Sequence, residues 1–388
     1  MEDLIIVEGV KKAIFGLGAV GKLPAEVESL GAARPLLIMD RALSGTNTGV
    51  RVQDIMQSGG FKTVKYFEVT PEPSPEIADR GVALAAKEKV DCVIGVGGGS
   101  TMDVAKAVAV LVKNGGNALD YVGLGLVKNS GLPTIMVPTT AGTGSEATFT
   151  SVFTMRQNRA KGGINSPFLY PNTAILDPEL LLNLPPLVSA YTGMDALTHA
   201  IESFTSLKAH FMSEPVSLKA VELISASLRA SISNGKDIRS RTNMLQASYL
   251  AGTSLAMSGV GAVHALAYPL GAFFDIPHGL ANAVMLPYVL EYNYLSNVSK
   301  FVTLAKVMGM ERNGRSDRAF AALVVDAVRD LSKDIGIPLT LKELDVPEHA
   351  IPEMAISAMG VTRPILNNPR PMTKDVAHNI YQKAMSGC

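Results

Sequence analysis

The fold class follows from residues 90–114, VDCVIGVGGGSTMDVAKAVAVLVKN. The apolar run that ends at Val96 predicts a buried strand, and three glycines follow it. From Thr101 onward the apolar residues recur at helical spacing. A strand that passes through a glycine turn into a helix is the building unit of a parallel sheet covered by helices.

The same alternation continues on both sides of this unit. Further candidate strands cover residues 33–40, 62–69, 133–140 and 172–177, and helical patterns cover 74–89 and 101–114. A hairpin is expected at 149–165, because the centre of VFTMRQNRAKGGI favours a turn. The first half of the chain, residues 1–186, therefore predicts an α/β domain with a parallel sheet covered on both faces.

The pattern changes near Pro185 and Pro186. Beyond them strand patterns almost disappear, and segments such as 213–233 and 316–336 carry apolar residues at helical spacing. We therefore expect an all-helical domain over residues 187–388, with an active site in the cleft between the two domains.

Composition and charge exclude several classes of protein. The 388 residues are 47% hydrophobic and 18% charged, and the formal net charge is zero, so bulk charge attracts neither nucleic acid nor an anionic membrane. No apolar run is long enough to span a membrane, and the first twelve residues do not resemble a signal peptide. Two cysteines, Cys92 and Cys388, indicate no disulfide framework, so we expect a cytoplasmic location.

Two loops that follow strands could bind phosphate groups. Residues 97–100, Gly-Gly-Gly-Ser, open a helix whose free N–H groups favour an anion, although they lack the GxGxxG fingerprint and a tight structural turn explains them equally well. Residues 138–146, PTTAGTGSE, add hydroxyl groups and glycines at the end of another strand. Asp40 ends a third strand, where a carboxylate can bind a ribose hydroxyl, although a solvent-facing turn is the simpler interpretation of Asp40 alone.

Four potential metal ligands lie in two patches of the helical half. Asp195 and His199 are four residues apart and so share one helix face, and His264 and His278 form the second patch. One carboxylate and three imidazoles suit a divalent first-row metal, chiefly Fe²⁺ or Zn²⁺. Glu202 on the same face could orient one of the ligands or could be a helix charge without a role.

Six segments, taken in order, resemble the iron-containing (group III) alcohol dehydrogenases. They are GGGSTMDVAKAVA, PTTAGTGSEAT, ILDPELLLNLP, GMDALTHAIES, the long segment from AGTSLAMSGVG to NAVMLP, and NNPRPMT. The resemblance covers nearly the whole chain. It implies a dinucleotide-binding α/β domain, a helical domain, and interconversion of a primary or secondary alcohol with its aldehyde or ketone by hydride transfer with NAD(H).

The resemblance also assigns roles to individual residues. The metal ligands fall on Asp195, His199, His264 and His278. The family metal is Fe²⁺, and Zn²⁺ is the alternative that the same ligands accept. The cofactor positions are Gly97, Gly98, Gly99, Ser100, Asp103, Thr139, Thr140, Thr143, Ser145 and Lys161, with Asp40 resembling the acidic residue of NAD-preferring members. We expect a homodimer or a larger homo-oligomer that acts on a small-molecule alcohol or aldehyde.

Three positions depart from the pattern of the family. Tyr268 stands where many members have a histidine proposed to relay protons, and a phenol with an ordinary pKa of about 10 relays poorly near neutrality. Tyr268 is therefore the candidate catalytic residue or only a wall of the pocket, and we favour the wall. Leu255 and Met257 replace an aromatic residue and an asparagine, which predicts a more apolar substrate pocket.

Two other functions stay open from the sequence. Dehydroquinate synthases share this architecture and use NAD⁺ and a divalent metal in a lyase-type reaction, but the GMDALTH and PTTAGTGSE segments favour the dehydrogenase. A non-catalytic NAD-binding or metal-storage protein is the second alternative, and the four intact ligand positions argue against it.

Overall fold

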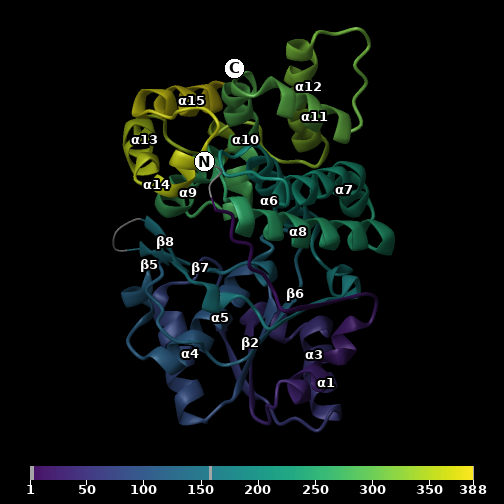
Figure 1. Ribbon diagram of the computed structural model, residues 1–388, viewed down its shortest axis with the longest axis vertical. Coiled ribbons are helices and arrows are strands. Elements are labelled where there is room, and N and C mark those ends of the chain that lie inside the picture. Colours follow the sequence, from purple (N-terminus) through teal and green to yellow (C-terminus); the bar gives the residue numbers. More distant parts are fainter. Residues whose placement is uncertain (1–3, 157–159, 388) are drawn as a thin grey trace. The chain divides into compact units, whose positions relative to one another are not determined.

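The structure, a computed structural model, describes residues 4–156 and 160–387. Within these residues the chain divides into two compact units (Figure 1), each described by itself below. The first unit comprises the described part of residues 1–140 together with 144–182, and the second comprises 141–143 together with 183–387.

The first unit is built on a six-stranded sheet in the order β1-β9-β6-β4-β2-β3, and the neighbouring strands pair in parallel. The five expected strands are present as β2 (Pro35–Asp40), β3 (Val64–Val69), β4 (Cys92–Gly97), β6 (Thr134–Pro138) and β9 (Thr173–Leu176). The predicted parallel sheet is therefore confirmed. Strand β1 (Lys12–Phe15) was not predicted, because it lies at the edge of the sheet, pairs with β9 and lacks a buried apolar run.

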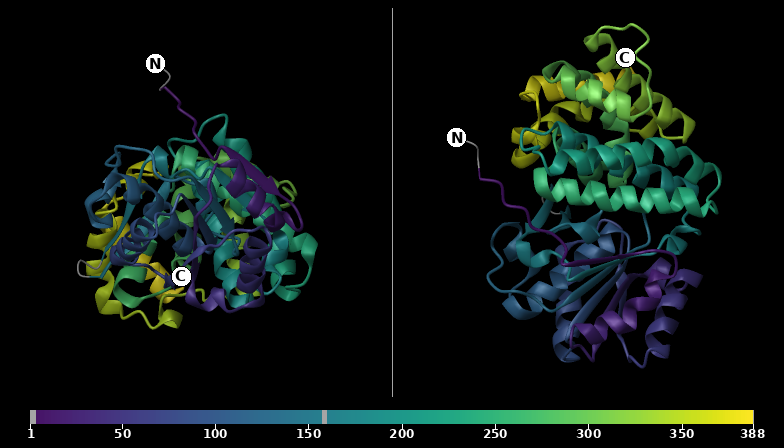
Figure 2. Two further views of the ribbon diagram at one scale, coloured as in Figure 1. Left: turned by 90° about the horizontal axis from the view of Figure 1, so that it is seen from below. Right: turned by 45° about the vertical axis from the view of Figure 1, so that its right-hand side comes forward.

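The helices of the first unit cover both faces of the sheet (Figures 1 and 2). Chain order runs outward from β2 to β3 and then turns back through β4 to β6. Because crossovers between parallel strands are right-handed, this reversal places α1 and α3 on one face and α4 and α5 on the other. Their bounds are α1 (Leu23–Ser29), α2 (Arg41–Ser44), α3 (Asn47–Ser58), α4 (Pro75–Lys87) and α5 (Gly99–Asn114).

Helix α5 is the core helix of this unit. Every residue from Thr101 to Leu111 is buried, because α5 packs on β4 and β6 and is covered by α4 and the β7 strand. An alanine- and valine-rich sequence without a polar stripe is the pattern of a helix buried on all sides.

The expected hairpin is present as β7 (Thr150–Met155) and β8 (Ala160–Asn165), which pair antiparallel. The centre of its expected turn, residues 157–159, lies outside the described residues. A short strand, β5 (Gly123–Leu124), adds to β8 in parallel. The 3-10 helices of the unit are η1 (Ala19–Lys22), η2 (Ala118–Tyr121), η3 (Ser145–Ala147), η5 (Pro167–Leu169) and η6 (Pro178–Leu181).

The described residues of the second unit form helices and no strand, as the sequence predicts. The helices are α6 (Pro186–Thr205), α7 (Ser213–Ser233), α8 (Ile238–Ser258), α9 (Ala262–Phe274), α10 (His278–Asn293), α11 (Val298–Val307), α12 (Asp317–Asp334), α13 (Ile351–Met359), α14 (Thr362–Asn367) and α15 (Lys374–Ser386), with 3-10 turns η7 (Tyr294–Ser296), η8 (Lys342–Leu344) and η9 (Glu348–Ala350). Helix α6 packs against α7, α8 and α10, and α6 to α8 lie side by side in Figure 2.

Helix α6 approaches its neighbours closely because of one glycine. A Cβ atom at Gly193 would lie 2.3 Å from Leu228 Cδ1 of α7. Nearly the whole of α6 from Gly193 to Thr205 is buried. Polar side chains on this helix are therefore removed from water and need partners.

Helix α9 contains a proline within its length. It continues through Pro269 to Phe274. Proline removes one backbone hydrogen bond and does not by itself end a helix that neighbours hold in place. Helix α9 is held in this way, since it packs against α10, α13 and α14.

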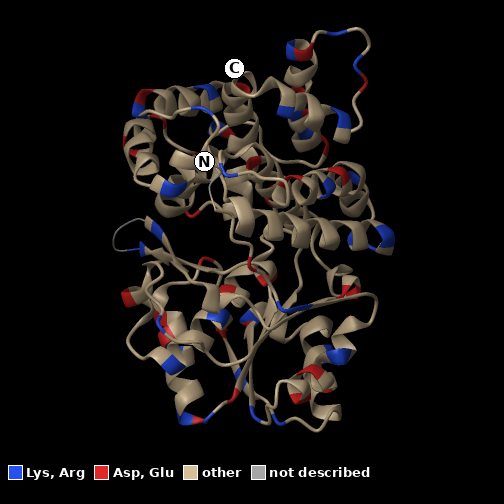
Figure 3. Ribbon diagram, in the orientation of Figure 1, with Lys and Arg blue, Asp and Glu red and all other residues tan. Residues whose placement is uncertain are grey.

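The surface carries both signs of charge on each unit. Lysine and arginine positions and aspartate and glutamate positions are both spread over each unit (Figure 3), in keeping with the zero net charge. In the described part of the chain no single helix meets the length and hydropathy needed to cross a membrane. Helices α8 and α9 meet that test only as a pair, and a bend of 106° separates them.

Candidate metal centre

The second unit brings the four sequence-predicted ligands together. Asp195 and His199 lie one turn apart on the buried face of α6, with 3.9 Å between Asp195 Oδ1 and His199 Nε2. His264 comes from the first turn of α9, and His278 is the first residue of α10. One ligand atom from each of the four residues lies within 4.8 Å of all the others.

Close packing of α10 on α6 brings the last ligand into reach. A Cβ atom at Gly279 would lie 2.6 Å from the Tyr191 carbonyl oxygen and 3.3 Å from Asp195 Cβ. Glycine directly after His278 therefore lets the start of α10 touch α6. The imidazole nitrogen Nε2 of His278 then stands 3.9 Å from Asp195 Oδ1.

The imidazole rings also contact one another. The rings of His199 and His264 stack with centroids 4.7 Å apart, and those of His264 and His278 are tilted at 5.4 Å. The three rings thus surround a single carboxylate, that of Asp195, which is 1% exposed.

The electrostatics of the cluster favour the protonation states that metals require. Burial raises the pKa of the Asp195 carboxyl, but the imidazoles of His199, His278 and His264 outweigh it, so that this pKa lies below its ordinary value. Burial lowers the pKa of His199, although the Asp195 carboxylate opposes the effect. An ionised carboxylate beside a neutral imidazole is the form in which both residues bind a cation.

Asn282 completes the inner surface of the cluster. Its Nδ2 atom donates to Asp195 Oδ1 at 2.7 Å and lies 3.1 Å from His264 Nε2 and 3.2 Å from His278 Nε2. Its Oδ1 atom is buried and has no hydrogen-bond partner among the described residues. Asn282 was not among the residues predicted for this site. Its position four residues after His278 places both on one face of α10, and this spacing was the signal in the sequence that could have indicated it.

These residues fit a divalent cation. Ligand-type atoms that converge within 4.8 Å, a buried carboxylate and a buried amide oxygen without a partner together form a polar pocket that protein groups alone do not satisfy. One oxygen and three imidazole nitrogens form a donor set that suits Fe²⁺ or Zn²⁺.

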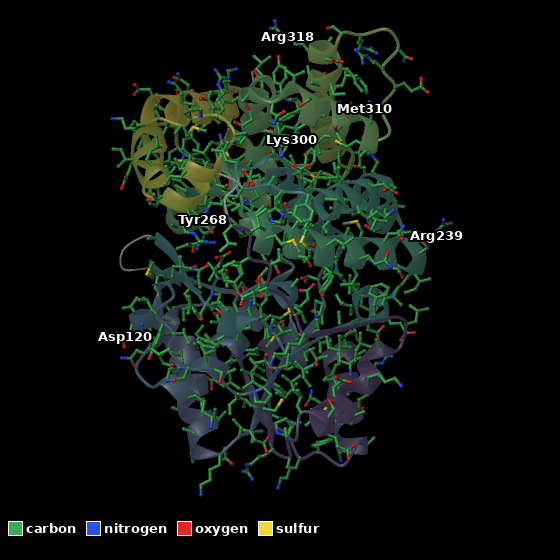
Figure 4. The ribbon with its side chains drawn as sticks, viewed as in Figure 1. Asp120, Arg239, Tyr268, Lys300, Met310 and Arg318 are labelled. Carbon is green, nitrogen blue, oxygen red and sulfur yellow. The ribbon has the colours of Figure 1, made fainter. Side chains whose placement is uncertain are left out.

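Tyr268 lies beside the cluster and is half-buried. It stands one turn after His264 on α9, and its ring centroid is 5.8 Å from that of His278. Figure 4 shows its side chain extending from α9. This placement is compatible with either of the roles expected for it.

The cofactor residues predicted in the first unit gather at the ends of parallel strands. Gly97 ends β4, Gly98 is the N-cap of α5, and Asp40 ends the adjacent strand β2. The chain leaves β2 toward α3 on one face of the sheet and leaves β4 toward α5 on the other. Ligands of open α/β sheets bind at such a switch point, beyond the carboxyl ends of the strands.

Close packing requires a glycine at position 97 of the first loop. A Cβ atom at Gly97 would lie 2.6 Å from Thr101 Oγ1, whereas one at Gly98 would make an ordinary contact of 3.5 Å with the Thr140 side chain. The Thr139 N–H donates to the Gly97 carbonyl at 3.0 Å, which joins the two predicted loops at their starts. Gly99 and Ser100 form the first turn of α5, where N–H groups lack helical acceptors.

Asp103 and Ser145 are engaged with each other. Ser145 Oγ donates to Asp103 Oδ1 at 2.5 Å, and the Val152 N–H donates to Asp103 Oδ2 at 2.9 Å. The buried Lys106 ammonium adds an ion pair with Asp103 at 3.1 Å and a hydrogen bond to the Ser145 carbonyl at 3.0 Å. This network ties the second loop and the hairpin to α5.

Asp40 and Lys161 also have partners within the unit. Asp40 Oδ1 accepts the Leu43 N–H at 2.7 Å as the N-cap of α2. Lys161 on β8 forms an ion pair with Glu72, and its side chain is 3% exposed. Thr143 is half-buried on the second loop.

One buried group of this loop was missed from the sequence. Glu146 is 1% exposed, and neither carboxylate oxygen has a hydrogen-bond partner among the described residues. Burial raises its pKa to about 7, an effect that the Lys106 ammonium partly opposes. A local sequence pattern carries no signal for this burial, since Glu146 resembles an ordinary loop residue.

Comparison with known proteins identifies the family. Residues 11–178 match the family described as iron-containing alcohol dehydrogenase, and residues 189–385 match the C-terminal part of the Fe-containing alcohol dehydrogenase family. The chain belongs to the iron-containing alcohol dehydrogenase family. It is accordingly an oxidoreductase that interconverts alcohols and carbonyl compounds with NAD(H) and a metal, and the dehydroquinate synthase alternative is disfavoured.

Individual relatives match over nearly their whole length. Long-chain-alcohol dehydrogenase 1 of Geobacillus thermodenitrificans is 38% identical over 96% of this chain and 94% of its own, and sulfoacetaldehyde reductase of Bilophila wadsworthia is 37% identical over 94% and 95%. A crystal structure of 1,3-propanediol oxidoreductase superposes with a TM-score of 0.96 at 33% identity over 99% of this chain and 100% of that one. Sulfoacetaldehyde reductase from Bifidobacterium kashiwanohense in complex with NAD⁺ gives 0.88 at 29% identity over 100% of both chains.

Proposed function

We propose that Asp195, His199, His264 and His278 hold the divalent metal of this dehydrogenase. The observation that carries the proposal is the convergence of the four ligand atoms within 4.8 Å in a buried cluster. When bound, the metal supplies Lewis acidity at the alcohol oxygen, and NAD⁺ supplies the hydride acceptor. The chain contributes a buried Asp195 carboxylate and three imidazoles whose nitrogen atoms can bind a cation.

We assign the pyrophosphate of NAD(H) to Gly97, Gly98, Gly99 and Ser100. The free N–H groups at the start of α5 and the positive end of its dipole favour an anion there. The threonines of the second loop, Thr139, Thr140 and Thr143, offer hydroxyl donors. The hydrogen bond between Ser145 and Asp103 stabilises this loop. These two residues therefore contribute to cofactor binding by shaping the site.

Asp40 is assigned to the ribose of the cofactor. Its Oδ1 atom is used in capping α2, so Oδ2 is the atom available to a 2′-hydroxyl. A carboxylate at the end of β2 would repel a 2′-phosphate, and NAD(H) is therefore expected in preference to NADP(H). Lys161, which is paired with Glu72, is assigned a place on the cofactor side of the hairpin.

The substrate class proposed is a primary or secondary alcohol without a charged group. Leu255 and Met257 lie half-buried on α8 at the positions that line the pocket in the family. Apolar side chains there offer no partner to a sulfonate or carboxylate group. Tyr268 is assigned to the wall of the same pocket.

A substrate panel tests the whole proposal. Metal-free protein is reconstituted anaerobically with Fe²⁺ or Zn²⁺, and NADH formation is followed with 1-butanol, 1,2-propanediol and 1,3-propanediol, and NADH consumption with sulfoacetaldehyde. We expect metal-dependent turnover, highest with 1-butanol and lowest with sulfoacetaldehyde. Turnover by the metal-free protein at the reconstituted rate would contradict the metal assignment, and a preference for sulfoacetaldehyde would contradict the pocket assignment.

We further propose a homo-oligomer in the cytoplasm. The assembly is supported by an exposed apolar run near the N-terminus, in which Leu4 is 87% and Ile6 is 73% exposed. The location is supported by the requirement for NAD(H) and by Cys92, a free and buried cysteine that forms no disulfide. Sedimentation of the full chain tests the assembly, and a monomer at micromolar concentration would contradict it.

A further inference from the structure

Glu202 connects α6 to the ligand-bearing start of α9. It follows Asp195 by two turns on the same buried face, and it is 4% exposed. Its Oε2 atom lies 2.6 Å from His264 Nδ1, and its Oε1 atom accepts the Val263 N–H at 2.6 Å. The two oxygens of this buried carboxylate therefore contact two adjacent residues of α9, Val263 and His264.

The local sequence makes α9 depend on groups from elsewhere. Its N-cap is Gly261, which has no side chain to accept the free N–H groups of the first turn. Glu202 accepts one of them, and Asn368 Oδ1 accepts another from Ala262 at 3.2 Å. A Cβ atom at Gly261 would lie 3.0 Å from Glu202 Oε1, so the glycine also leaves room for the carboxylate.

The contact with His264 has a further consequence. An ionised carboxylate accepts hydrogen bonds and donates none, so the imidazole nitrogen that faces it must carry the proton. With the proton on Nδ1, the lone pair of a neutral His264 is on Nε2. Nε2 lies 3.1 Å from Asn282 Nδ2, the atom that also contacts Asp195 Oδ1 and His278 Nε2.

We propose that Glu202 is a positioning residue that fixes His264 as the Nδ1–H tautomer and thereby sets the affinity of the centre for its metal. The inference rests on the proposed metal site. It goes beyond that site because it assigns metal affinity to a residue that does not touch the metal. Carboxylates in this position orient the histidine and increase its basicity as a ligand.

The variant Glu202→Gln separates this role from helix capping. The amide oxygen of glutamine still accepts the Val263 N–H, so the cap is kept, while its NH₂ group now donates to His264 Nδ1. The proton then belongs on Nε2, where it blocks the lone pair. The isosteric change leaves the packing of α6 and α9 in place.

The measurement is the Zn²⁺ dissociation constant of the full chain, obtained by competition with a chromophoric chelator, together with the Tm of the metal-free protein. For Glu202→Gln we expect binding weaker by about ten- to a hundredfold and a Tm within about 3 °C of the unmodified protein. Glu202→Asp, which keeps an acceptor carboxylate, should bind Zn²⁺ more tightly than Glu202→Gln. Unchanged affinity in Glu202→Gln, or weaker binding in Glu202→Asp than in Glu202→Gln, would overturn the proposal.

Two further variants distinguish the possible failures. Asn368→Ala removes the other acceptor of the α9 cap without touching His264, and we expect it to lower the metal-free Tm and leave the Zn²⁺ affinity unchanged. If Asn368→Ala weakens Zn²⁺ binding as much as Glu202→Gln does, the effect is one of helix capping and the tautomer inference fails. His264→Ala should lose Zn²⁺ binding outright, and tight binding by this variant would refute the metal site itself.

Discussion

The burial of Glu146 can be tested by measuring how protein stability depends on pH, without an enzyme assay. Its carboxyl is buried without a hydrogen-bond partner among the described residues, and burial raises its pKa from 4.5 to about 7. The folded protein therefore holds this proton more tightly than the unfolded chain does. The resulting contribution to stability is complete below about pH 4.5 and is lost as the pH rises through about 7.

The size of the effect follows from the two pKa values. At 1.36 kcal/mol per pKa unit, the difference between 4.5 and about 7 corresponds to about 3 kcal/mol. Glu146→Gln keeps the shape of the side chain and carries no charge at any pH. The free energy of unfolding of this variant, relative to the unmodified protein, should therefore increase by up to about 3 kcal/mol between pH 4.5 and pH 8.5.

The assay is urea unfolding followed by circular dichroism at several pH values from 5 to 8.5. Metal-free protein is used because metal binding is itself dependent on pH, and the difference between the two proteins cancels the histidines that both contain. Glu222→Gln is the matched control, since Glu222 has a side chain 53% exposed and a surface ion pair with Lys219. A stability difference for Glu146→Gln that stays constant from pH 5 to 8.5 would refute the buried, unpaired carboxyl.

Three further predictions concern the proposed sites. His278→Ala should remove the bound metal and the activity while the circular dichroism spectrum is kept, and full metal content in this variant would contradict the ligand assignment. Asp40→Gly should narrow or reverse the preference for NAD(H) over NADP(H), by about 1–3 kcal/mol in kcat/KM, with little loss of stability because glycine is tolerated at an N-cap. An unmodified protein that uses both cofactors equally would argue against a role for Asp40. Tyr268→Phe should retain most of kcat and change mainly KM, whereas a loss of kcat of about a hundredfold or more would show that the hydroxyl relays a proton.

The strands and helices were predictable where burial is continuous along the chain. The runs that became β4 and β6 are buried at every position, so their valines and isoleucines form an unbroken signal. Strand β1 gave no such signal in the sequence, because it is an edge strand with exposed residues. It is stabilised by pairing with β9, about 160 residues away. Two-residue β5 depends on β8 in the same way.

The convergence of the four proposed ligands was partly predictable from the sequence, and the residues around them were not. Asp195 and His199 share a helix face by spacing alone, but the approach of α9 and α10 depends on contacts between residues 60 to 90 positions apart. Asn282 and Gly279 are among the surrounding residues that the sequence did not indicate. Their local sequence is ordinary, and their function follows only from the neighbours that folding brings to them.

A comparison of three buried acids, Asp195, Glu202 and Glu146, shows how position decides what a carboxylate does. Asp195 is stabilised by the imidazoles around it, and its pKa is lowered. Glu202 is stabilised by hydrogen bonds from α9 to both of its oxygens. Glu146 has no hydrogen-bond partner among the described residues, and the Lys106 ammonium offsets only part of the effect of burial, so its ionisation destabilises the fold. A buried glutamine would avoid that cost, so the acid at position 146 lowers the stability of the folded protein as the pH rises through about 7.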